Sequence, residues 1–300
     1  MPRIDGVNYA PEYNDIKRKD LPPGQTVAMH APFIEITSRQ NKNIQQTCLL
    51  HDRKARAAEK ACIVEGMKIL SELSPASNPI RMLFVSKDRQ KAIPDSLTPL
   101  LSAAGQIFVV DSHLMEAISG TETPEGFLAV AEVKDSSAEA PDISSMSFIL
   151  ILDSIKDPGN LGTIFRTSYA AGVSSLILFG GSVDAYNAKT IRASAGTVFK
   201  LPFFSVSEDR ISIVQDLKVM GLRIAASVMQ GGERYWGFDY RPPLAFVLGN
   251  ESHGISEKLL SICDCKVTIP MENPIESLNI STSAALLCYK FLEKKNCAKW

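Results

Sequence analysis

The chain has 300 residues, of which 45% are hydrophobic and 22% are charged, and 32 basic residues balance 33 acidic ones to a net charge of −1. This composition excludes a wholly disordered chain, a collagen and a coiled coil, and the length allows about two domains with separate cores. The longest apolar run, Phe148–Leu152, is far shorter than the ~20 residues of a membrane-spanning helix, so we expect no membrane segment.

Residues 1–35 are rich in proline and charge and show no sustained periodicity, which predicts a largely irregular N-terminal extension. The extension lacks the apolar stretch of a secretory signal. Its acidic residues are atypical of a transit peptide. The six cysteines are scattered, and Cys263 and Cys265 form a CxC with no partner pair, so we expect reduced thiols and no zinc site. These features predict an intracellular, reducing compartment, either the cytoplasm or, if a presequence is missing, a chloroplast or mitochondrion.

Short apolar runs alternate with helical patterns over residues 36–133. The runs CIVEG, RMLFVSK, QIFVV and GFLAVAEV are typical of strands, and MKILSEL and SHLMEAIS are typical of helices. This alternation predicts a small α/β domain. The polar segment 134–147, with its prolines and serines, is the expected linker to the next domain.

Residues 148–296 contain five short, nearly continuous apolar segments, FILILD, SSLILFG, LRIAASV, LAFVLG and KVTIP. Such segments are typical of strands buried on both faces, so this half is expected to form a mainly parallel α/β sheet. We predict a helix capped by Asn160, with an apolar face that includes Leu161 and Phe165, ending at Gly172. A second helix is expected after Ser207, and a last one ends in the lysines of FLEKK.

Polar turns follow three of these strands, and ligands bind at the carboxyl ends of parallel strands. The turns are SIKDPGNLGTIFRTSYAAG, NESHGIS and MENPIESLNIS. No GxGxxG, GxxxxGK[ST], HExxH or GxSxG pattern is present, which disfavours dinucleotide, P-loop, zinc-protease and α/β-hydrolase sites.

The three turns together resemble the motifs of the SpoU/TrmH family of RNA 2′-O-ribose methyltransferases, in the SPOUT superfamily. The matching residues are Asp157-Pro158-Gly159-Asn160-Leu161-Gly162 with Arg166 and Ala171-Gly172; Leu248-Gly249-Asn250-Glu251 with Gly254-Ile255; and Ile269-Pro270-Met271 with Glu276-Ser277-Leu278-Asn279-Ile280-Ser281. The segments ITSRQNKNIQ, LHDRKAR, VEG and GTETPEGFLAV are similar to the small RNA-binding domain that precedes the catalytic domain in many members.

This resemblance implies an S-adenosylmethionine-dependent enzyme that methylates a ribose 2′-hydroxyl of rRNA or tRNA by direct in-line displacement. It also implies a deep trefoil knot at the cofactor site and a homodimer. The residues implied for catalysis are Asn160, Arg166, Glu251, Ser277 and Asn279. The residues implied for cofactor binding are Leu248, Gly249, Ile269, Met271 and Leu278.

Each of these polar residues also has a purely structural interpretation. Asn160 is explained as a helix N-cap, Glu251 as a first-turn carboxylate, and Ser277 and Asn279 as turn formers. The family often assigns the arginine at position 166 as the base that removes the hydroxyl proton. Because a guanidinium holds its proton up to a pKa above about 12, Arg166 has a second interpretation, in which it grips a phosphate or stabilises alkoxide charge.

Residues 39–60 carry six cations against two acids, unlike the balanced whole chain. We interpret this run as a phosphate-contacting patch for structured RNA, with Arg39, Arg53, Lys54 and Arg56 as its candidates. The alternative interpretation is a solvated helix face.

Two other functions fit parts of the sequence. A non-catalytic RNA-binding or ribosome-assembly paralogue would retain the fold without binding cofactor. A small-molecule α/β enzyme would show no salt-dependent binding to RNA.

Overall fold

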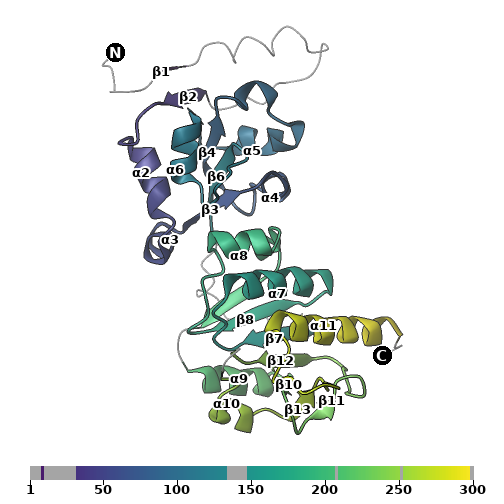
Figure 1. Cartoon of the computed structure of the whole chain (residues 1–300). Coiled ribbons are helices and arrows are strands. Elements are labelled where there is room, and N and C mark those ends of the chain that lie inside the picture. Colours follow the sequence, from purple (N-terminus) through teal and green to yellow (C-terminus); the bar gives the residue numbers. More distant parts are fainter. Residues whose placement is uncertain (1–7, 10–31, 134–146, 207–208, 251–252, 298–300) are drawn as a thin grey trace. The chain divides into compact units, whose positions relative to one another are not determined.

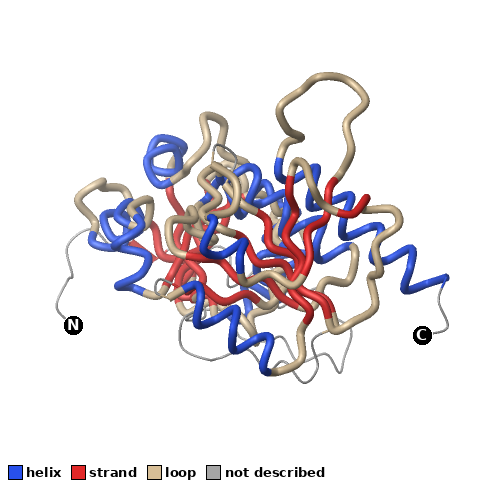
Figure 2. The backbone as a smooth tube through the Cα atoms, turned by 90° about the horizontal axis from the view of Figure 1, so that it is seen from below, coloured by secondary structure: helices blue, strands red, loops and turns tan. Residues whose placement is uncertain are grey.

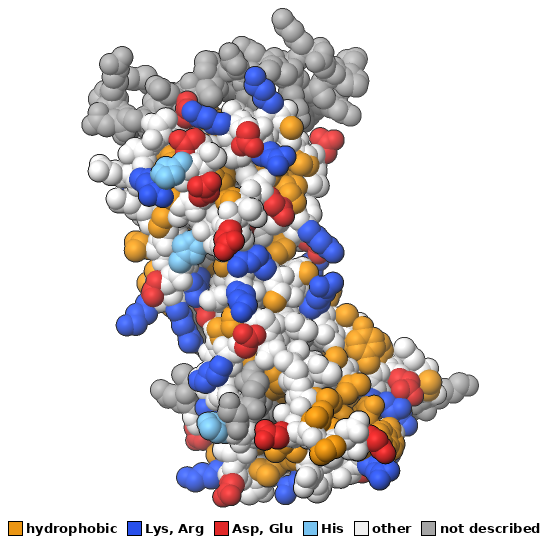
Figure 3. Space-filling view, in the orientation of Figure 1, with side chains coloured by type: hydrophobic (Ala, Val, Ile, Leu, Met, Phe, Trp, Pro, Cys, Tyr) orange, Lys and Arg blue, Asp and Glu red, His pale blue; other side chains and the backbone are white. Residues whose placement is uncertain are grey.

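A computed structural model describes residues 8–9, 32–133, 147–206, 209–250 and 253–297 (Figure 1). The chain divides into two compact units at residues 134 and 135, with Tyr186–Ala188 grouped with the first unit. The predicted linker lies outside the described residues apart from its last residue, Ser147. Helices surround the strands in the backbone view of Figure 2. Basic and acidic side chains are interspersed on the face shown in Figure 3.

The first unit contains a mixed six-stranded sheet with the order β1-β2-β5-β4-β6-β3. Strands β2, β5 and β4 are parallel, whereas β6 runs antiparallel to both β4 and β3. Strand β3 therefore runs in the same direction as β4. The strands are β1 (Asn8–Tyr9), β2 (Phe33–Ile36), β3 (Ala61–Glu65), β4 (Ile80–Ser86), β5 (Gln106–Val110) and β6 (Phe127–Glu132).

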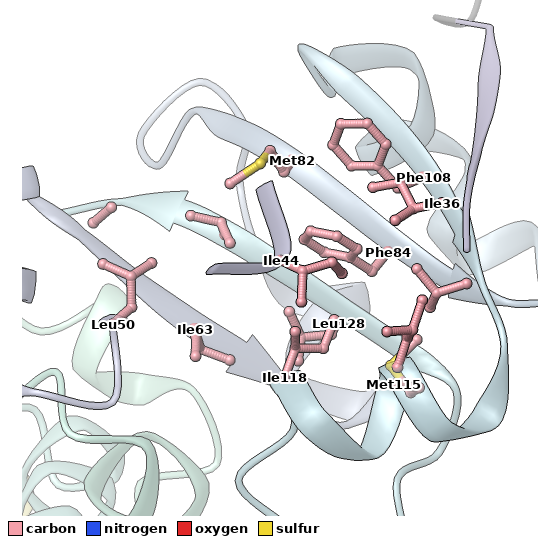
Figure 4. Close-up of a cluster of buried hydrophobic side chains, with 14 residues drawn as sticks. Ile36, Ile44, Leu50, Ile63, Met82, Phe84, Phe108, Met115, Ile118 and Leu128 are labelled. Carbon is pink, nitrogen blue, oxygen red and sulfur yellow. The ribbon is translucent and has the colours of Figure 1, made fainter. Parts of the chain in front are cut away.

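Helices cover both faces of this sheet. Helices α2 and α6 pack on one face, where Ile44 and Leu114 join Phe84 and Phe108 in a buried cluster (Figure 4). Helices α4 and α5 contact β3 and β4 from the other face (Figure 1). Their buried residues Leu70 and Leu100 do not belong to the cluster under α2 and α6. The helices are α2 (Lys42–Leu49), α3 (Arg53–Glu59), α4 (Met67–Glu72), α5 (Thr98–Ala103) and α6 (Ser112–Ile118), with short 3-10 turns η1 (Gln90–Ala92) and η2 (Asp95–Leu97).

The expectation of a largely irregular chain up to residue 35 misses two short strands, β1 at Asn8–Tyr9 and the start of β2. Phe33–Ile36 forms strand β2, which pairs with β5 and with β1. Phe33 and Ile36 are only 4% and 1% exposed, so this strand is held by burial of its apolar residues. Four residues beside a proline-rich stretch are too few to show a period, which is why the sequence did not reveal it.

The second unit contains a seven-stranded sheet with the order β11-β13-β10-β12-β7-β8-β9. Every pairing is parallel, which confirms the predicted parallel sheet. The strands are β7 (Phe148–Leu152), β8 (Ser175–Phe179), β9 (Phe203–Val206), β10 (Arg223–Val228), β11 (Glu233–Arg234), β12 (Leu244–Leu248) and β13 (Cys265–Thr268). The two strands that the sequence did not predict, β9 and β11, are short and are the outermost strands of the sheet. The knot implied by the family stays a prediction.

Helices also lie on both faces of the second sheet. Helices α7 and α11 lie side by side on one face (Figure 1), where Phe291 stacks on Phe148 with ring centroids 4.1 Å apart. Helices α9 and α10 cover the other face through Leu217 and Leu259. The helices are α7 (Pro158–Ala170), α8 (Ala188–Ala193), α9 (Arg210–Val219), α10 (Glu257–Ser261) and α11 (Ile280–Cys297), with a 3-10 turn η4 (Thr197–Phe199).

The C-terminal end predicted for α7 agrees with the structure better than the N-terminal cap predicted for α9. The backbone turns left-handed at Gly172 just after α7, with φ of 73°, as predicted for a terminating glycine. The predicted cap of α9, Ser207, lies outside the described residues, and Asp209 caps that helix by accepting from the Ser212 N–H. None of the described helices combines the length and the apolar character that a membrane crossing requires.

Candidate active site

The carboxyl edge of the second sheet brings the three predicted motifs to one place. Leu152 at the end of β7 is in register with Leu248 at the end of β12. Strand β10 pairs with both β12 and β13, so the turns that follow β7, β12 and β13 all leave the same edge. The coincidence predicted from the sequence is therefore confirmed by the register of the strands.

The first motif begins helix α7. Asp157, not Asn160, is its N-cap, because the Asp157 carboxylate accepts from the Asn160 N–H at 2.8 Å. Pro158 occupies the first helical position, where the absence of an N–H costs nothing. The predicted cap at Asn160 is wrong by three residues. As a consequence, the side chain of Asn160 is not used to start the helix.

The Asn160 side chain instead joins the first motif to the third. The Asn279 amide donates from Nδ2 to Asn160 Oδ1 at 3.0 Å. At its other end, Asn279 Oδ1 accepts from the N–H of Ser281 at 2.8 Å and from its hydroxyl at 2.6 Å. Asn279 thus caps the start of α11 and fixes the amide of Asn160 with the same side chain.

Arg166 lies on the exposed side of α7. The buried side of the helix carries Leu161, Ile164, Phe165 and Ser168, as the sequence predicted. Arg166 is exposed, and no ion pair joins its guanidinium to any residue that the structure describes. Its guanidinium therefore lies on the solvent-facing side of the helix.

The second motif folds back on itself after β12. Asn250 and Gly254 exchange two backbone hydrogen bonds, at 3.1 and 2.9 Å. A methyl group on Gly249 would lie 2.3 Å from the carbonyl carbon of Gly254, so only glycine allows this close approach. The Asn250 amide also donates to the Ser154 carbonyl at 2.8 Å, which ties the loop to the end of β7. The predicted catalytic residue Glu251 lies outside the described residues.

The predicted cofactor residues divide into two groups. Ile269, Met271 and Leu278 are half-buried in the turn after β13, with apolar surface still accessible. Leu248 is only 2% exposed, and its carbonyl accepts from the Asp153 N–H. The structure therefore does not support a side-chain contact from Leu248, whose position at the end of a buried strand delivers Gly249 to the edge. Ser277 is exposed.

The sequence missed the end of β10 as part of this site. Because β10 lies between β12 and β13, Val228 and Met229 lie between the second and third motifs. Met229 is 60% exposed, an unusual position for a large apolar side chain. The strand itself was predicted, but the residues after it carry no polar motif, and only the strand order reveals that they belong here.

In the first unit, one predicted RNA-contacting residue is structural. Arg56 is 5% exposed, and its Nη1 donates to the carbonyls of Leu50 and His51, each at 2.8 Å. A buried guanidinium that satisfies two carbonyls cannot also reach a phosphate. The expectation that Arg56 contacts RNA is therefore wrong, whereas Arg39, Arg53 and Lys54 are exposed.

The three exposed candidates do not form one patch. Arg39 follows the carboxyl end of β2, whereas α3, which begins at Arg53, leads into the amino end of β3. Strands β2 and β3 run in the same direction. Arg39 therefore lies at the carboxyl ends of the strands, whereas Arg53 and Lys54 lie toward their amino ends, and the ~12 Å length of α2 separates the two positions. Lys87 and Arg89 follow β4 and therefore share the edge of Arg39. The sequence missed both because they are distant in the chain.

A buried glutamate links two loops at the carboxyl edge of the first sheet. Glu65, at the end of β3, accepts from the hydroxyls of Ser119 at 2.6 Å and Thr121 at 3.1 Å, and from the Gly120 N–H at 3.3 Å. These bonds join the VEG and GTETPEG segments, which lie far apart in the sequence. Among the described residues, no three His, Cys, Asp or Glu side chains are grouped to hold a metal ion.

The second unit is thus a parallel α/β domain with a ligand-type site at its carboxyl edge, preceded by a smaller α/β unit. The model of the SpoU rRNA Methylase family matches residues 147–289, and that of the MRM3-like substrate binding domain matches residues 41–129. The chain therefore contains a SpoU methylase domain over residues 147–289.

Several relatives match most of the chain. The 23S rRNA (guanosine(2553)-2′-O)-methyltransferase RlmP of Bacillus subtilis is 29% identical over 255 residues, which are 85% of this chain and 98% of the relative. A 23S rRNA (uridine(2479)-2′-O)-methyltransferase of Streptomyces viridochromogenes is 28% identical over 269 residues, covering 87% and 92%.

Solved structures share the fold. An RNA 2′-O ribose methyltransferase aligns with a TM-score of 0.75 at 28% identity, covering 87% of this chain and 99% of that chain. An AdoMet-bound rRNA methyltransferase from Sinorhizobium meliloti aligns with a TM-score of 0.77 at 23% identity, covering 89% and 99%.

Proposed function

We propose that the protein is an S-adenosylmethionine-dependent methyltransferase that modifies a ribose 2′-hydroxyl in rRNA or tRNA. The observation that carries this proposal is the hydrogen bond between Asn279 and Asn160, which joins two motifs more than a hundred residues apart at the carboxyl edge of a parallel sheet. The names of the relatives, which are rRNA 2′-O-methyltransferases, support the same activity.

The residues at this edge fit S-adenosylmethionine. An adenine and a methionine chain need shape, apolar contact and a few backbone amides more than they need charge. Half-buried Ile269, Met271 and Leu278 provide apolar surface, and the absence of a side chain at Gly249 lets the backbone of Gly254 and Ile255 pack closely against it, which shapes the loop. Met229, at the end of β10, adds a fourth apolar side chain between the two loops. When bound, the cofactor supplies an electrophilic methyl group.

The polar residues of the edge act on the ribose. Asn160 and Asn279 hold each other's amides, so they present fixed hydrogen-bonding groups to the sugar. Ser277 adds a hydroxyl from the same loop as Asn279. Since a guanidinium keeps its proton, we assign Arg166 to stabilising the charge that develops on the 2′-oxygen or to holding the adjacent phosphate. Glu251 is proposed to orient this arginine.

The first unit is proposed to hold structured RNA. Phosphate contacts fix the position of an RNA, and exposed cations provide them. Of the exposed candidates, Arg39 shares its edge with Lys87 and Arg89 and with the loop that Glu65 holds. Arg53 and Lys54 lie at the other edge. We therefore favour the carboxyl edge of the first sheet as the RNA-binding side.

We propose that the protein is a homodimer through helix α11. One apolar face of this helix is core, because Leu287 and Phe291 are buried. Its other side carries half-buried Leu286 and Tyr289, which is 52% exposed, and hydrophobic side chains gather over α11 and the neighbouring strands in Figure 3. A second copy would fill the shallow hollow of about 390 Å³ there, lined by Tyr235, Thr282, Ala285, Leu286, Tyr289, Lys290 and Glu293.

The six cysteines support a reducing, intracellular compartment. All six are free thiols, including exposed Cys297. Burial raises the pKa of Cys288 to about 12 and that of Cys263 to about 11, which keeps both protonated and unreactive.

Calorimetric titration of the whole protein with S-adenosylmethionine tests the proposal. Saturable binding is expected, together with RNA binding that weakens as salt rises. RNA binding without cofactor binding would favour a non-catalytic assembly factor that keeps the fold. Cofactor binding without salt-dependent RNA binding would favour a small-molecule enzyme.

A further inference from the structure

A three-way hydrogen-bond network lies beside the end of β7, outside the three family motifs. Arg210, the first residue of α9, donates from Nη1 to Asp153 Oδ1. Its Nη2 donates to the Ser154 hydroxyl at 3.1 Å and to the Gly180 carbonyl at 2.6 Å. One guanidinium thus joins α9 to the residues that follow β7 and β8.

The network holds two groups that are unfavourable without it. Asp153 is only 3% exposed, and a buried carboxylate is costly unless a cation pairs with it. Ser154 has φ of 63°, a left-handed conformation that is uncommon for residues with a side chain and costs free energy that the surroundings must offset. Its hydroxyl also lies 3.0 Å from Asp153 Oδ1 and 3.1 Å from the Gly180 carbonyl oxygen.

The conformation of Ser154 sets the direction of its carbonyl, and that carbonyl accepts from the Asn250 amide at 2.8 Å. Asn250 closes the loop of the second motif by its two backbone bonds to Gly254. A chain of contacts therefore leads from Arg210 through Ser154 to Asn250 and the loop that carries Gly249.

We infer that Arg210 is a positioning residue for the cofactor-binding loop. It holds the left-handed turn at Ser154, and the turn places the acceptor to which Asn250 is fastened. Arg210 itself touches neither cofactor nor RNA in this role. The inference that loop order governs cofactor affinity rests on the proposed function, whereas the link from Arg210 to loop order does not.

Amide hydrogen exchange of the whole protein without ligand tests the link. In Arg210→Met, peptides covering 249–250 and 253–255 are expected to exchange about tenfold faster, because the hydrogen bonds between Asn250 and Gly254 open more often. Arg223→Met is the matched control. Arg223 is 34% exposed against 36% for Arg210, and it also pairs with an aspartate, Asp239, but it begins β10 at the opposite edge of the sheet. The control is expected to leave these peptides unchanged.

Cofactor affinity provides the second measurement. Arg210→Met and Asn250→Ala are each expected to weaken S-adenosylmethionine binding about tenfold, and the double variant to bind no more weakly than the worse single variant, because both changes break one chain of contacts. Arg210→Lys is expected to fall between wild type and Arg210→Met, since an ammonium can pair with Asp153 but cannot span the other two acceptors.

Unchanged loop exchange in Arg210→Met, or fully additive losses of affinity in the double variant, would overturn the inference. Faster loop exchange in Arg210→Met, in a protein that binds no cofactor even as wild type, would support the link and count against the proposed function alone.

Discussion

In the second unit, the loops at the carboxyl edge are fastened to one another: Asn279 to Asn160, and Asn250 to Ser154. In the first unit, the buried Glu65 carboxylate accepts hydrogen bonds from a loop at the carboxyl edge, and cations such as Arg39 at this edge are exposed to solvent. The first kind of edge is suited to a small ligand that needs fixed geometry, and the second to a polyanion that needs charge. The two edges should therefore respond differently to substitution and to salt.

The largest effect is expected at Gly249. Gly249→Ala places a methyl group 2.3 Å from the carbonyl carbon of Gly254, so the loop must open and cofactor affinity should fall about a hundredfold or more. Gly237→Ala is the matched control, because its new methyl group would meet nothing closer than 3.7 Å. Calorimetry with S-adenosylmethionine measures both. Wild-type affinity in Gly249→Ala would show that the tight loop is not part of the cofactor site.

The next effect separates the two roles of Asn279. Asn279→Asp keeps an acceptor for the Ser281 N–H but loses the donor to Asn160, so the rate of methyl transfer should fall about a hundredfold while the melting temperature stays near that of wild type. Asn279→Ala removes the cap as well and should cost a further ~1 kcal/mol of stability. Methylation rates and thermal melts distinguish the two, and full activity in Asn279→Asp would break the proposed link between the motifs.

A tenfold effect is expected on RNA binding in the first unit. The Arg39→Ala, Arg89→Ala double variant should weaken RNA binding about tenfold. The slope of log K against log salt concentration should become shallower by about 0.7–0.9 for each phosphate that is no longer neutralised. Cofactor affinity should not change. The Arg53→Ala, Lys54→Ala double variant, at the other edge, is the comparison. A larger loss of affinity in the second pair than in the first would assign RNA to the amino edge instead.

The smallest effect on RNA binding is expected at Arg56. Arg56→Met leaves the carbonyls of Leu50 and His51 without their donor, so the free energy of unfolding should fall by roughly 2–3 kcal/mol. RNA affinity, measured below the unfolding temperature, should stay within about twofold of wild type. A tenfold loss of affinity with unchanged stability would restore Arg56 as a phosphate contact.

The sequence predicted the elements that a simple period defines. The five apolar runs of the second unit are strands, and the face of α7 with Leu161 and Phe165 is buried. It also predicted that three turns meet, because parallel strands end at one edge. The N-cap of α7 was predicted at the wrong residue because Asp157 and Asn160 are both good capping residues. Pro158 favours Asp157, since proline fits the first position of a helix.

Properties that depend on strand order lay beyond the sequence. A count of charges cannot tell that Arg56 is buried or that α2 separates Arg39 from Arg53. Likewise, Met229 follows an ordinary strand, and only the place of β10 between β12 and β13 brings it into the site. The network of Arg210 joins residues from three elements and has no local pattern.

The proposed activity is tested by transfer of labelled methyl groups from S-adenosylmethionine to total rRNA and tRNA, followed by digestion to nucleosides. We expect label in 2′-O-methylated nucleosides with wild-type protein and about a hundredfold less with Arg166→Ala. Absence of ribose label with intact wild-type protein, or equal label with Arg166→Ala, would contradict it.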